Sequence, residues 1–228
     1  MNVKNKAGAT APGYRVVARG NNRGEIYLYG PIGADWFGEG VSAKMFADDL
    51  KKLGAVSTLD VRINSEGGDV FVGKAMYSLL KEHKAKVIVH VDGLSASAAS
   101  FVMMAGDEIE IAEGAFVMIH DAYGGARGRA KDLRDYADLL DSVNASIVDT
   151  YVARTKNDAA TIRKWMSDET WMQGPEAVER GFADRLSGKS TAKASAAISN
   201  PRMYSNLPQE LRPKRSAAAA LLAPLRAP

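Results

Sequence analysis

The chain has 228 residues, contains no cysteine and carries a formal net charge of +3. The lack of cysteine excludes disulfide bonds, a thiolate nucleophile and cysteine-ligated zinc. No apolar run is long enough to cross a bilayer and no secretory signal is visible, so we expect a cytoplasmic protein without a membrane partner.

The two ends of the chain differ in charge from its middle. Residues 1–23 and 188–228 are mainly basic, whereas residues 24–187 carry an acidic excess. Both ends lack apolar periodicity and are rich in small and polar residues. We therefore predict one folded domain over residues 24–187, between a flexible basic N-terminal segment and a disordered, basic, Ala-rich tail. We interpret the basic charge as that of solvated extensions, so nucleic acid is not an expected partner.

Within the predicted domain, short apolar runs typical of strands are separated by segments with helical periodicity. Alternating strands and helices are typical of βαβ units, so the sequence predicts an α/β fold with a largely parallel sheet. The strand patterns cover residues 25–29, 59–64, 87–91, 108–111 and 115–119, and the helical patterns cover residues 41–50, 70–80 and 98–105.

A long helix is predicted over residues 129–154, which contain neither glycine nor proline. Its apolar residues recur at about every third or fourth position, with charged residues between them. At roughly 25 residues it exceeds the usual range of globular helices. An amphipathic helix of this kind often packs on a partner subunit. Shorter helices are expected at residues 158–165 and 175–180.

Small residues fill the junction between the strand 87–91 and the helix 98–105. Such a junction lets the backbone turn sharply and leaves amide groups free at the start of the helix, where an anionic oxygen is favoured. A serine there is placed to attack a carbonyl group. The junction offers three candidate nucleophiles, Ser95, Ser97 and Ser100.

Three other features supply what a serine nucleophile needs. His120 directly follows a predicted strand, where a polar side chain points toward the ligand crevice of an α/β sheet, and it is the candidate base. Gly67 and Gly68 follow another predicted strand and, with the amide of Ala98, are candidates for an oxyanion hole. An orienting carboxylate is also required, and spacing leaves several candidates open: Asp121, Asp168, Glu169 and Asp184.

Four motifs, in this order, resemble segments of the Clp protease proteolytic subunit family. They are a Gly-Gly segment at 63–70, a nucleophile segment at 93–100, a histidine strand at 117–120, and an acid segment with its closing helix at 169–184. The resemblance covers residues 24–187. Four ordered motifs over most of the chain make this resemblance specific.

The resemblance implies a role for each site residue. Ser97 would be the nucleophile, His120 the base and Glu169 the acid of a catalytic triad. The family has an aspartate at the acid position, so the neighbouring Asp168 stays open as the alternative acid. Glu66 stands where the family has a turn proline. The oxyanion hole is implied at Gly67, Gly68 and Ala98.

The resemblance also implies a crotonase-like fold of repeated ββα units with a protruding helical arm. The long helix 129–154 lies where that arm joins rings face to face, so a ring homo-oligomer that encloses the active sites is expected. The chemistry of the triad needs no metal or organic cofactor. The sequence carries no Walker-type loop, so an ATP-driven unfoldase would be a separate chain.

Two further segments, residues 29–38 and 168–171, resemble the Clp-related proteases encoded by phages and prophages, which are associated with head maturation. The sequence therefore predicts a serine endopeptidase that cuts scaffold or capsid precursor proteins. One alternative is a general degradative peptidase fed by a separate unfoldase. Another is an acyl-CoA hydratase or isomerase on the same scaffold, and the last is an assembly protein that has lost catalysis.

Overall fold

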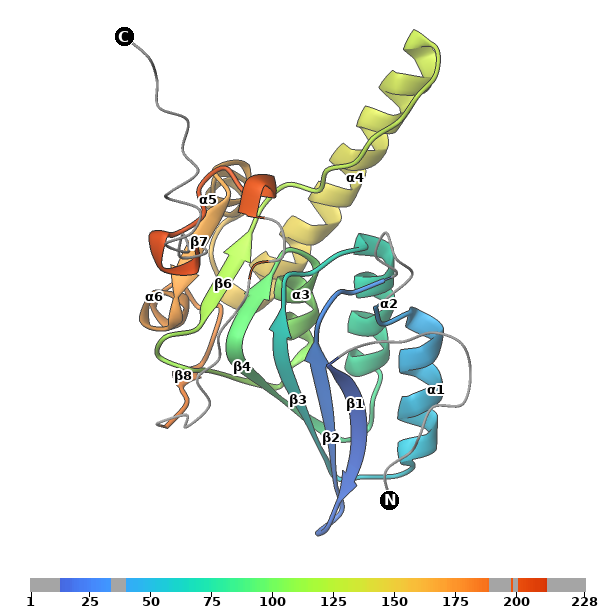
Figure 1. The fold of residues 1–228 in the computed structure, drawn as a ribbon, viewed down its shortest axis with the longest axis vertical. Helices are drawn as coiled ribbons and strands as arrows, with labels where there is room; N and C mark the ends of the chain where they lie inside the picture. The colour runs from blue at the N-terminus through green and yellow to red at the C-terminus, as the bar shows by residue number, and fades with distance from the viewer. Residues whose placement is uncertain (1–12, 34–39, 189–197, 199–200, 213–228) are drawn as a thin grey trace, which may run out of the picture.

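The structure, a computed structural model, describes residues 13–33, 40–188, 198 and 201–212. Its strands form one sheet of α/β type, with helices packed against it (Figure 1). The predicted α/β class is confirmed. The strands are β1 (Tyr14–Arg19), β2 (Arg23–Tyr29), β3 (Thr58–Ser65), β4 (Lys86–Ala96), β5 (Glu108–Ile111), β6 (Phe116–Ile119), β7 (Thr170–Gln173) and β8 (Arg185–Leu186).

The sheet has the strand order β1-β2-β3-β4-β5-β8, and β6 joins it through β4. The pairs from β2 to β8 along this order are parallel, as is the pair of β4 with β6. The end pairs, β1 with β2 and β6 with β7, are antiparallel. The largely parallel sheet predicted from the alternating pattern is therefore present.

Strand β4 is the element that positions the site. Its first part, Ile88–Val91, pairs with β5, and its last part, Leu94–Ala96, pairs with β6. The strand thus changes partner along its length and ends directly before Ser97. Because Ala96 lies opposite Met118 in the register, the residues that follow β4 and β6 emerge at the same edge of the sheet.

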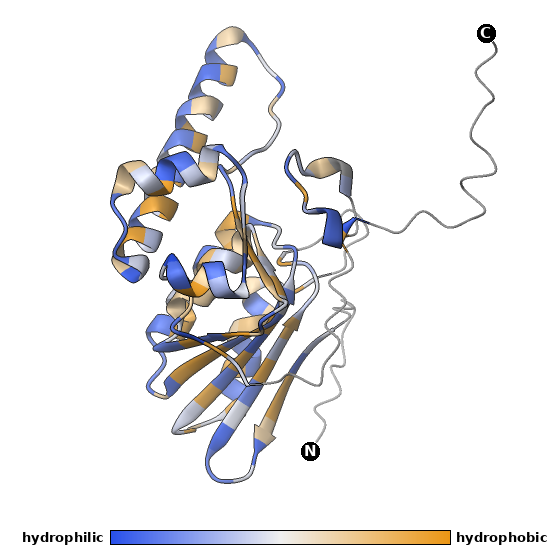
Figure 2. Cartoon of the chain, turned by 90° about the vertical axis from the view of Figure 1, so that its left-hand side faces the viewer, coloured by the Kyte–Doolittle hydropathy of each residue, from blue (hydrophilic) through white to orange (hydrophobic). Residues whose placement is uncertain are grey.

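Helices cover one face of the sheet and bury its apolar residues. In β2 the side chains alternate between buried and half-buried positions, with Ile26 and Leu28 fully buried. Figure 2 shows this alternation as apolar and polar bands along the strands. Side-chain oxygens cap two of the covering helices at their N-termini. These helices are α1 (Ala43–Leu53), capped by Ser42, and α2 (Val70–Lys81), capped by Asp69.

Between β2 and β5, the other face of the sheet is lined by charged side chains. Arg23 of β2 forms a bidentate pair with Asp60 of β3. His90 of β4 lies between two carboxylates, with Nε2 3.0 Å from Asp60 and Nδ1 3.2 Å from Glu110. Between β2 and β5 the sheet therefore has one apolar face toward the helices and one polar face, which explains the alternating pattern of these strands. In β6 all four residues are buried, and Phe116 and Met118 belong to a second apolar cluster with Leu94 and Ala96 of β4.

The long predicted helix is present as α4 (Ala130–Thr155) and projects from the body of the molecule (Figure 1). Its buried residues, from Val143 onward, all lie in the half nearest the sheet. The outer half exposes large apolar side chains, including Leu133 and Leu139. The remaining helices are α3 (Ala98–Val102), α5 (Ala159–Ser167), α6 (Gly174–Glu179) and the short 3₁₀ helices η1 (Met103–Ala105), η2 (Pro201–Met203) and η3 (Gln209–Leu211). In the part of the chain that the structure describes, no helix combines the length and the apolar character that a membrane crossing requires.

Two segments predicted to be flexible contain ordered structure, so the prediction is wrong for them. Tyr14–Arg19 forms β1, because β2 offers it an antiparallel partner at the sheet edge. Residues 201–212 fold back onto the domain, because Ile198 and Leu207 bury apolar side chains against β4 and β6. The other residues of both predicted tails, and residues 34–39, lie outside the described residues.

Candidate active site

Ser97 lies in a tight turn between β4 and α3. Its φ of 52° and ψ of −126° are unusual for a residue with a side chain. The backbone around it is fixed, since Ser97 N donates to the carbonyl of Met118 and Ser97 O accepts from the amide of Ser100. Strained backbone held by its surroundings is common at functional sites.

The structure separates the three candidate serines. Ser95 is fully buried, and its hydroxyl has no hydrogen-bond partner among the described residues. Ser100 is also fully buried, and its hydroxyl contacts the carbonyl of Ser97 at 2.6 Å and the hydroxyl of Tyr151 at 2.7 Å. Ser97, by contrast, lines a cleft of about 810 Å³. It is therefore the serine placed to meet a ligand.

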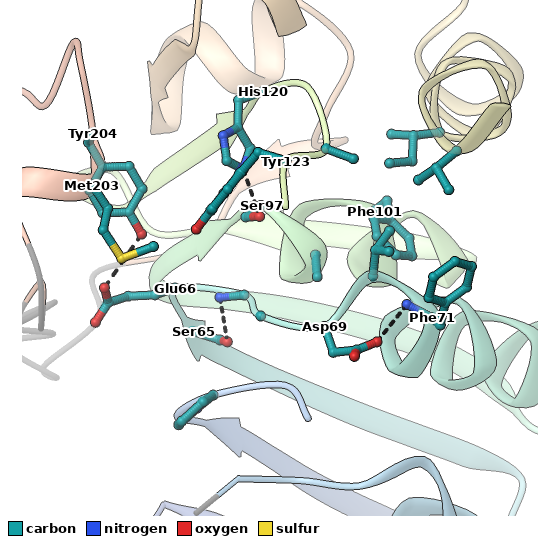
Figure 3. A pocket seen from close by; sticks show the side chains of 18 of the residues that line it. Ser65, Glu66, Asp69, Phe71, Ser97, Phe101, His120, Tyr123, Met203 and Tyr204 are labelled. Carbon is teal, nitrogen blue, oxygen red and sulfur yellow. Dashed lines mark hydrogen bonds between the residues drawn. The ribbon is translucent and has the colours of Figure 1, made fainter. Parts of the chain in front are cut away.

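His120 directly follows β6, and its side chain meets the hydroxyl of Ser97 (Figure 3). The distance from His120 Nε2 to Ser97 Oγ is 2.8 Å. Burial lowers the pKa of His120, and the charges of Glu169 and Asp121 oppose this without reversing it. The imidazole is therefore neutral at pH 7, and a neutral nitrogen can accept the serine proton.

Glu169 is the candidate acid that acts on His120, since its negative charge raises the pKa of the imidazole. Its carboxylate accepts hydrogen bonds from the amides of Ser205, at 2.8 Å, and Asn206, at 2.7 Å. Trp171 Nε1 lies 3.2 Å from the same carboxylate. Within the described ranges, no hydrogen bond joins His120 to Glu169, so the two groups interact through space.

The other candidate acids make different contacts. Asp168 pairs with Lys164 one helical turn earlier and has a half-exposed carboxylate. Asp184 accepts from the amide of Ile109 at 2.7 Å and from Arg154 at 2.6 Å, which makes it a structural residue. Asp121 follows His120 directly, and burial raises its own pKa.

The glycine turn lies directly against the nucleophile. Gly67 has a φ of 92°, and a Cβ placed on it would lie 2.5 Å from Ala96 O and 2.7 Å from Ala98 N. Only glycine fits there. The amide of Gly67 donates to Ser65 Oγ at 3.0 Å, so it is already engaged. The candidates for an oxyanion hole are thereby reduced to the amides of Gly68 and Ala98, and the latter begins α3 without an intrahelical acceptor.

The cleft around Ser97 has a volume of about 810 Å³ and two different ends. Toward α4 it is lined by apolar side chains, among them Phe101, Val143 and Ile147. At the other end, Met203 and Tyr204 from the C-terminal part of the chain stand beside Glu66 (Figure 3). No group of three or more potential metal-ligating side chains was found among the described residues.

The sequence analysis missed the residues at this second end of the cleft. They lie in the predicted tail, whose composition is polar and rich in small residues. One signal points to them, since Met203, Tyr204, Leu207 and Leu211 recur at three- and four-residue spacings in an otherwise polar stretch.

Comparisons with known proteins agree with this geometry. The family model described as Clp protease matches residues 9–190, which include Ser97, His120 and Glu169. ATP-dependent Clp protease proteolytic subunit 1 of Prochlorococcus marinus strain NATL2A is 30% identical over 172 residues, covering 72% of this chain and 83% of that protein. The subunit 1 of strain MIT 9312 is 32% identical over 133 residues, covering 58% of this chain and 68% of that protein. The α/β architecture described above is consistent with the crotonase-like fold of such proteins. The chain therefore belongs to the Clp protease family.

Proposed function

We propose that this chain is a serine endopeptidase that uses Ser97 as nucleophile and His120 as base. The observation that carries the proposal is the 2.8 Å contact between His120 Nε2 and Ser97 Oγ at the cleft. A neutral, half-buried imidazole beside a serine hydroxyl is the arrangement that acyl transfer requires. Membership of the Clp protease family supports the same chemistry.

The proposed reaction proceeds through an acyl-enzyme. Ser97 Oγ attacks the peptide carbonyl carbon while His120 Nε2 takes the hydroxyl proton. The amides of Gly68 and Ala98 donate to the oxyanion of the tetrahedral intermediate. His120 then gives its proton to the leaving amine, and the C–N bond breaks. A water molecule, deprotonated by His120, attacks the ester and releases the second product. Glu169 stabilises the imidazolium through its charge.

A fluorophosphonate probe, which reacts with an activated serine, distinguishes the proposed endopeptidase from the other activities considered for this fold. We expect the wild-type protein to be labelled and Ser97→Ala not to be labelled. Ser95→Ala is the matched control, because Ser95 is buried away from the cleft. Absence of labelling in the assembled wild-type protein would favour the acyl-CoA hydratase or the inactive assembly protein.

We also propose that the protein assembles as a ring homo-oligomer. The outer half of α4 supports this, because it projects from the body of the subunit and exposes large apolar side chains such as Leu133 (Figure 1). Exposed apolar surface of this kind marks an interaction site. A ring would enclose the cleft and keep folded proteins away from Ser97.

The narrower head-maturation function remains a proposal about the substrate. It is supported by the resemblance of residues 168–171 to phage and prophage proteases. The relatives named above are subunits of ATP-dependent Clp proteases, and they support a general degradative peptidase instead. Incubation with the products of neighbouring genes separates the two. Defined cuts in a capsid or scaffold protein support head maturation, whereas hydrolysis only of unfolded protein, or only with an ATP-dependent unfoldase, supports the general peptidase.

A further inference from the structure

The C-terminal segment, defined here as residues 203–207, lies beyond the part of the chain that matches the family model. That match ends at residue 190. The segment is nevertheless anchored to the domain, because Leu207 is buried among side chains of β4 and β6. The ring of Tyr204 also packs edge-on against Trp171, with centroids 5.3 Å apart. The segment is therefore a fixed part of the domain.

This segment contacts the candidate acid through its backbone. The amide of Ser205 donates to Glu169 Oε2, and the amide of Asn206 donates to Glu169 Oε1. The Asn206 side chain donates to the carbonyl of Asp168 at 2.6 Å. A carboxylate has about four acceptor positions, and with Trp171 three of them are used. One acceptor position on Oε2 remains, and Glu169 and His120 line the same hollow.

The backbone at Glu169 also requires support. Its φ of 49° lies in the left-handed region, which costs about 1–3 kcal/mol for a residue with a side chain. A strained conformation persists only when neighbouring contacts determine it. The three hydrogen bonds from Ser205 and Asn206 are such contacts, because they hold both the carboxylate and the preceding carbonyl.

The same segment reaches the cleft on the side of the glycine turn. Met203 and Tyr204 line the cleft together with Ser97 and His120. Tyr204 Oη lies 3.5 Å from a carboxylate oxygen of Glu66, the residue before Gly67. Burial, and next the charge of Glu66, raise the pKa of Tyr204, so its hydroxyl stays protonated and can donate to that carboxylate.

We propose that residues 203–207 are positioning and specificity residues of peptide hydrolysis. Ser205 and Asn206 fix the Glu169 carboxylate in the hollow beside His120, and Met203 and Tyr204 form the wall of the cleft at the end away from α4. A substrate side chain at that end meets the side chain of Met203 and the ring of Tyr204, so apolar residues are preferred there over charged ones. The inference rests on the proposed endopeptidase function.

Ser205→Pro tests the positioning role, because it removes the amide that donates to Glu169 Oε2. We expect its kcat to lie about tenfold below that of Ser205→Ala, which keeps the amide, since one hydrogen bond to a charged group is lost. Release of Glu169 also lowers the pKa of His120, so the acidic limb of kcat/KM moves to lower pH. Gln209→Pro, the same substitution outside the segment, is expected to keep the wild-type profile.

Three further variants keep the test decisive if Ser205→Pro folds poorly. Asn206→Ala removes only the bond to the Asp168 carbonyl, and we expect about a threefold loss of kcat with the same pH shift. In a Glu169→Gln background, neither segment variant should lower kcat further. Tyr204→Ala is expected to change KM and the preference between apolar and charged peptides more than it changes kcat.

The outcomes separate this inference from the proposed function. Wild-type protein that neither hydrolyses peptides nor takes up a fluorophosphonate overturns the proposed function, and this inference with it. Active wild-type protein with equal kcat values for Ser205→Pro and Ser205→Ala overturns the inference alone. A rise of kcat in Ser205→Pro overturns it too, since the segment would then be inhibitory.

Discussion

The proposed nucleophile and base, Ser97 and His120, are held by a different kind of structure from the candidate acid. Ser97 and His120 follow β4 and β6, two adjacent parallel strands, so sheet hydrogen bonds fix their distance. Glu169 lies in a turn after α5, and amides from residues 205 and 206 hold its side chain. The distance between Ser97 and His120 is therefore set by the regular sheet, whereas the position of the Glu169 carboxylate depends on a segment far away in the chain.

The largest effect is expected from removing the nucleophile. Ser97→Ala should lower kcat for a peptide substrate by at least about 10⁴-fold, because no covalent intermediate can form. Peptide hydrolysis and fluorophosphonate labelling measure this. If Ser97→Ala kept more than one-hundredth of the wild-type activity, Ser97 would not be the nucleophile.

A second substitution tests the close contact between the glycine turn and the nucleophile. Gly67→Ala should lower kcat by about 10²-fold, the scale of losing an oxyanion donor, because its Cβ must displace the backbone of Ala96 and Ala98. Gly20→Ala is the matched control, since a Cβ there meets no atom within 4 Å. Equal activity of the two variants would contradict the proposed geometry.

Substitution of Asp168 and Glu169 tests which of the two carboxylates acts on His120. Glu169→Gln should lower kcat by about tenfold, a smaller loss than for Ser97, because Glu169 acts on His120 through its charge. Asp168→Asn should change kcat by less than about twofold, since its carboxylate is half exposed and paired with Lys164. Steady-state kinetics of both variants decide the assignment, and the reverse order would make Asp168 the acid.

The pH dependence of the wild-type enzyme follows from the burial of His120. The acidic limb of kcat/KM reports deprotonation of the free base. Because burial lowers the pKa of His120, the active neutral form persists to lower pH, and the limb should fall below about 6.5, the ordinary histidine value. Asp121→Asn should move it lower still, since the Asp121 charge raises this pKa. A limb above 6.5 in the wild type would refute the stated direction.

The smallest effect on the chemistry within a subunit is expected at the outer half of α4. Leu133→Asp should weaken the proposed assembly, because it places a charge on an exposed apolar position. Leu133→Met, which keeps an apolar side chain, should assemble as the wild type does. Sedimentation velocity measures the oligomer, and circular dichroism should show the same helix content in both variants. An unchanged oligomer in Leu133→Asp would place the interface elsewhere.

Much of the fold could be predicted because its signals are local. The strands that became β2 to β6 have alternating or continuous apolar runs, and α4 has a long uninterrupted helical period. Strand β1 was missed, because its stability comes from pairing with β2 rather than from its own sequence. The segment 201–212 was missed for a similar reason, since a few apolar residues gain their burial only from the surface they meet.

In the candidate site, too, features with a local signal could be predicted and features that depend on distant contacts could not. The meeting of Ser97 and His120 could be predicted, because each residue follows a recognisable strand and motif. Sequence spacing left Asp168 and Glu169 equivalent, and their difference lies in side-chain direction and distant partners. Gly67 was predicted as an oxyanion donor, yet its amide bonds to Ser65. That bond depends on the conformation of the turn, which residue types alone do not determine.

One consequence of β4 concerns how the domain opens and unfolds. A single continuous strand joins β3 and β5 at one end to β6 at the other. An opening that detaches β4 therefore exposes the amides of both parts of the sheet, the part around β3 and β5 and the part around β6. The two parts form one cooperative unit. The amides of Val87–Ala96 should be among the slowest to exchange with deuterium. Fraying of the edge strands β1 and β8 would leave the contact between Ser97 and His120 intact, whereas any opening that releases β4 would break it.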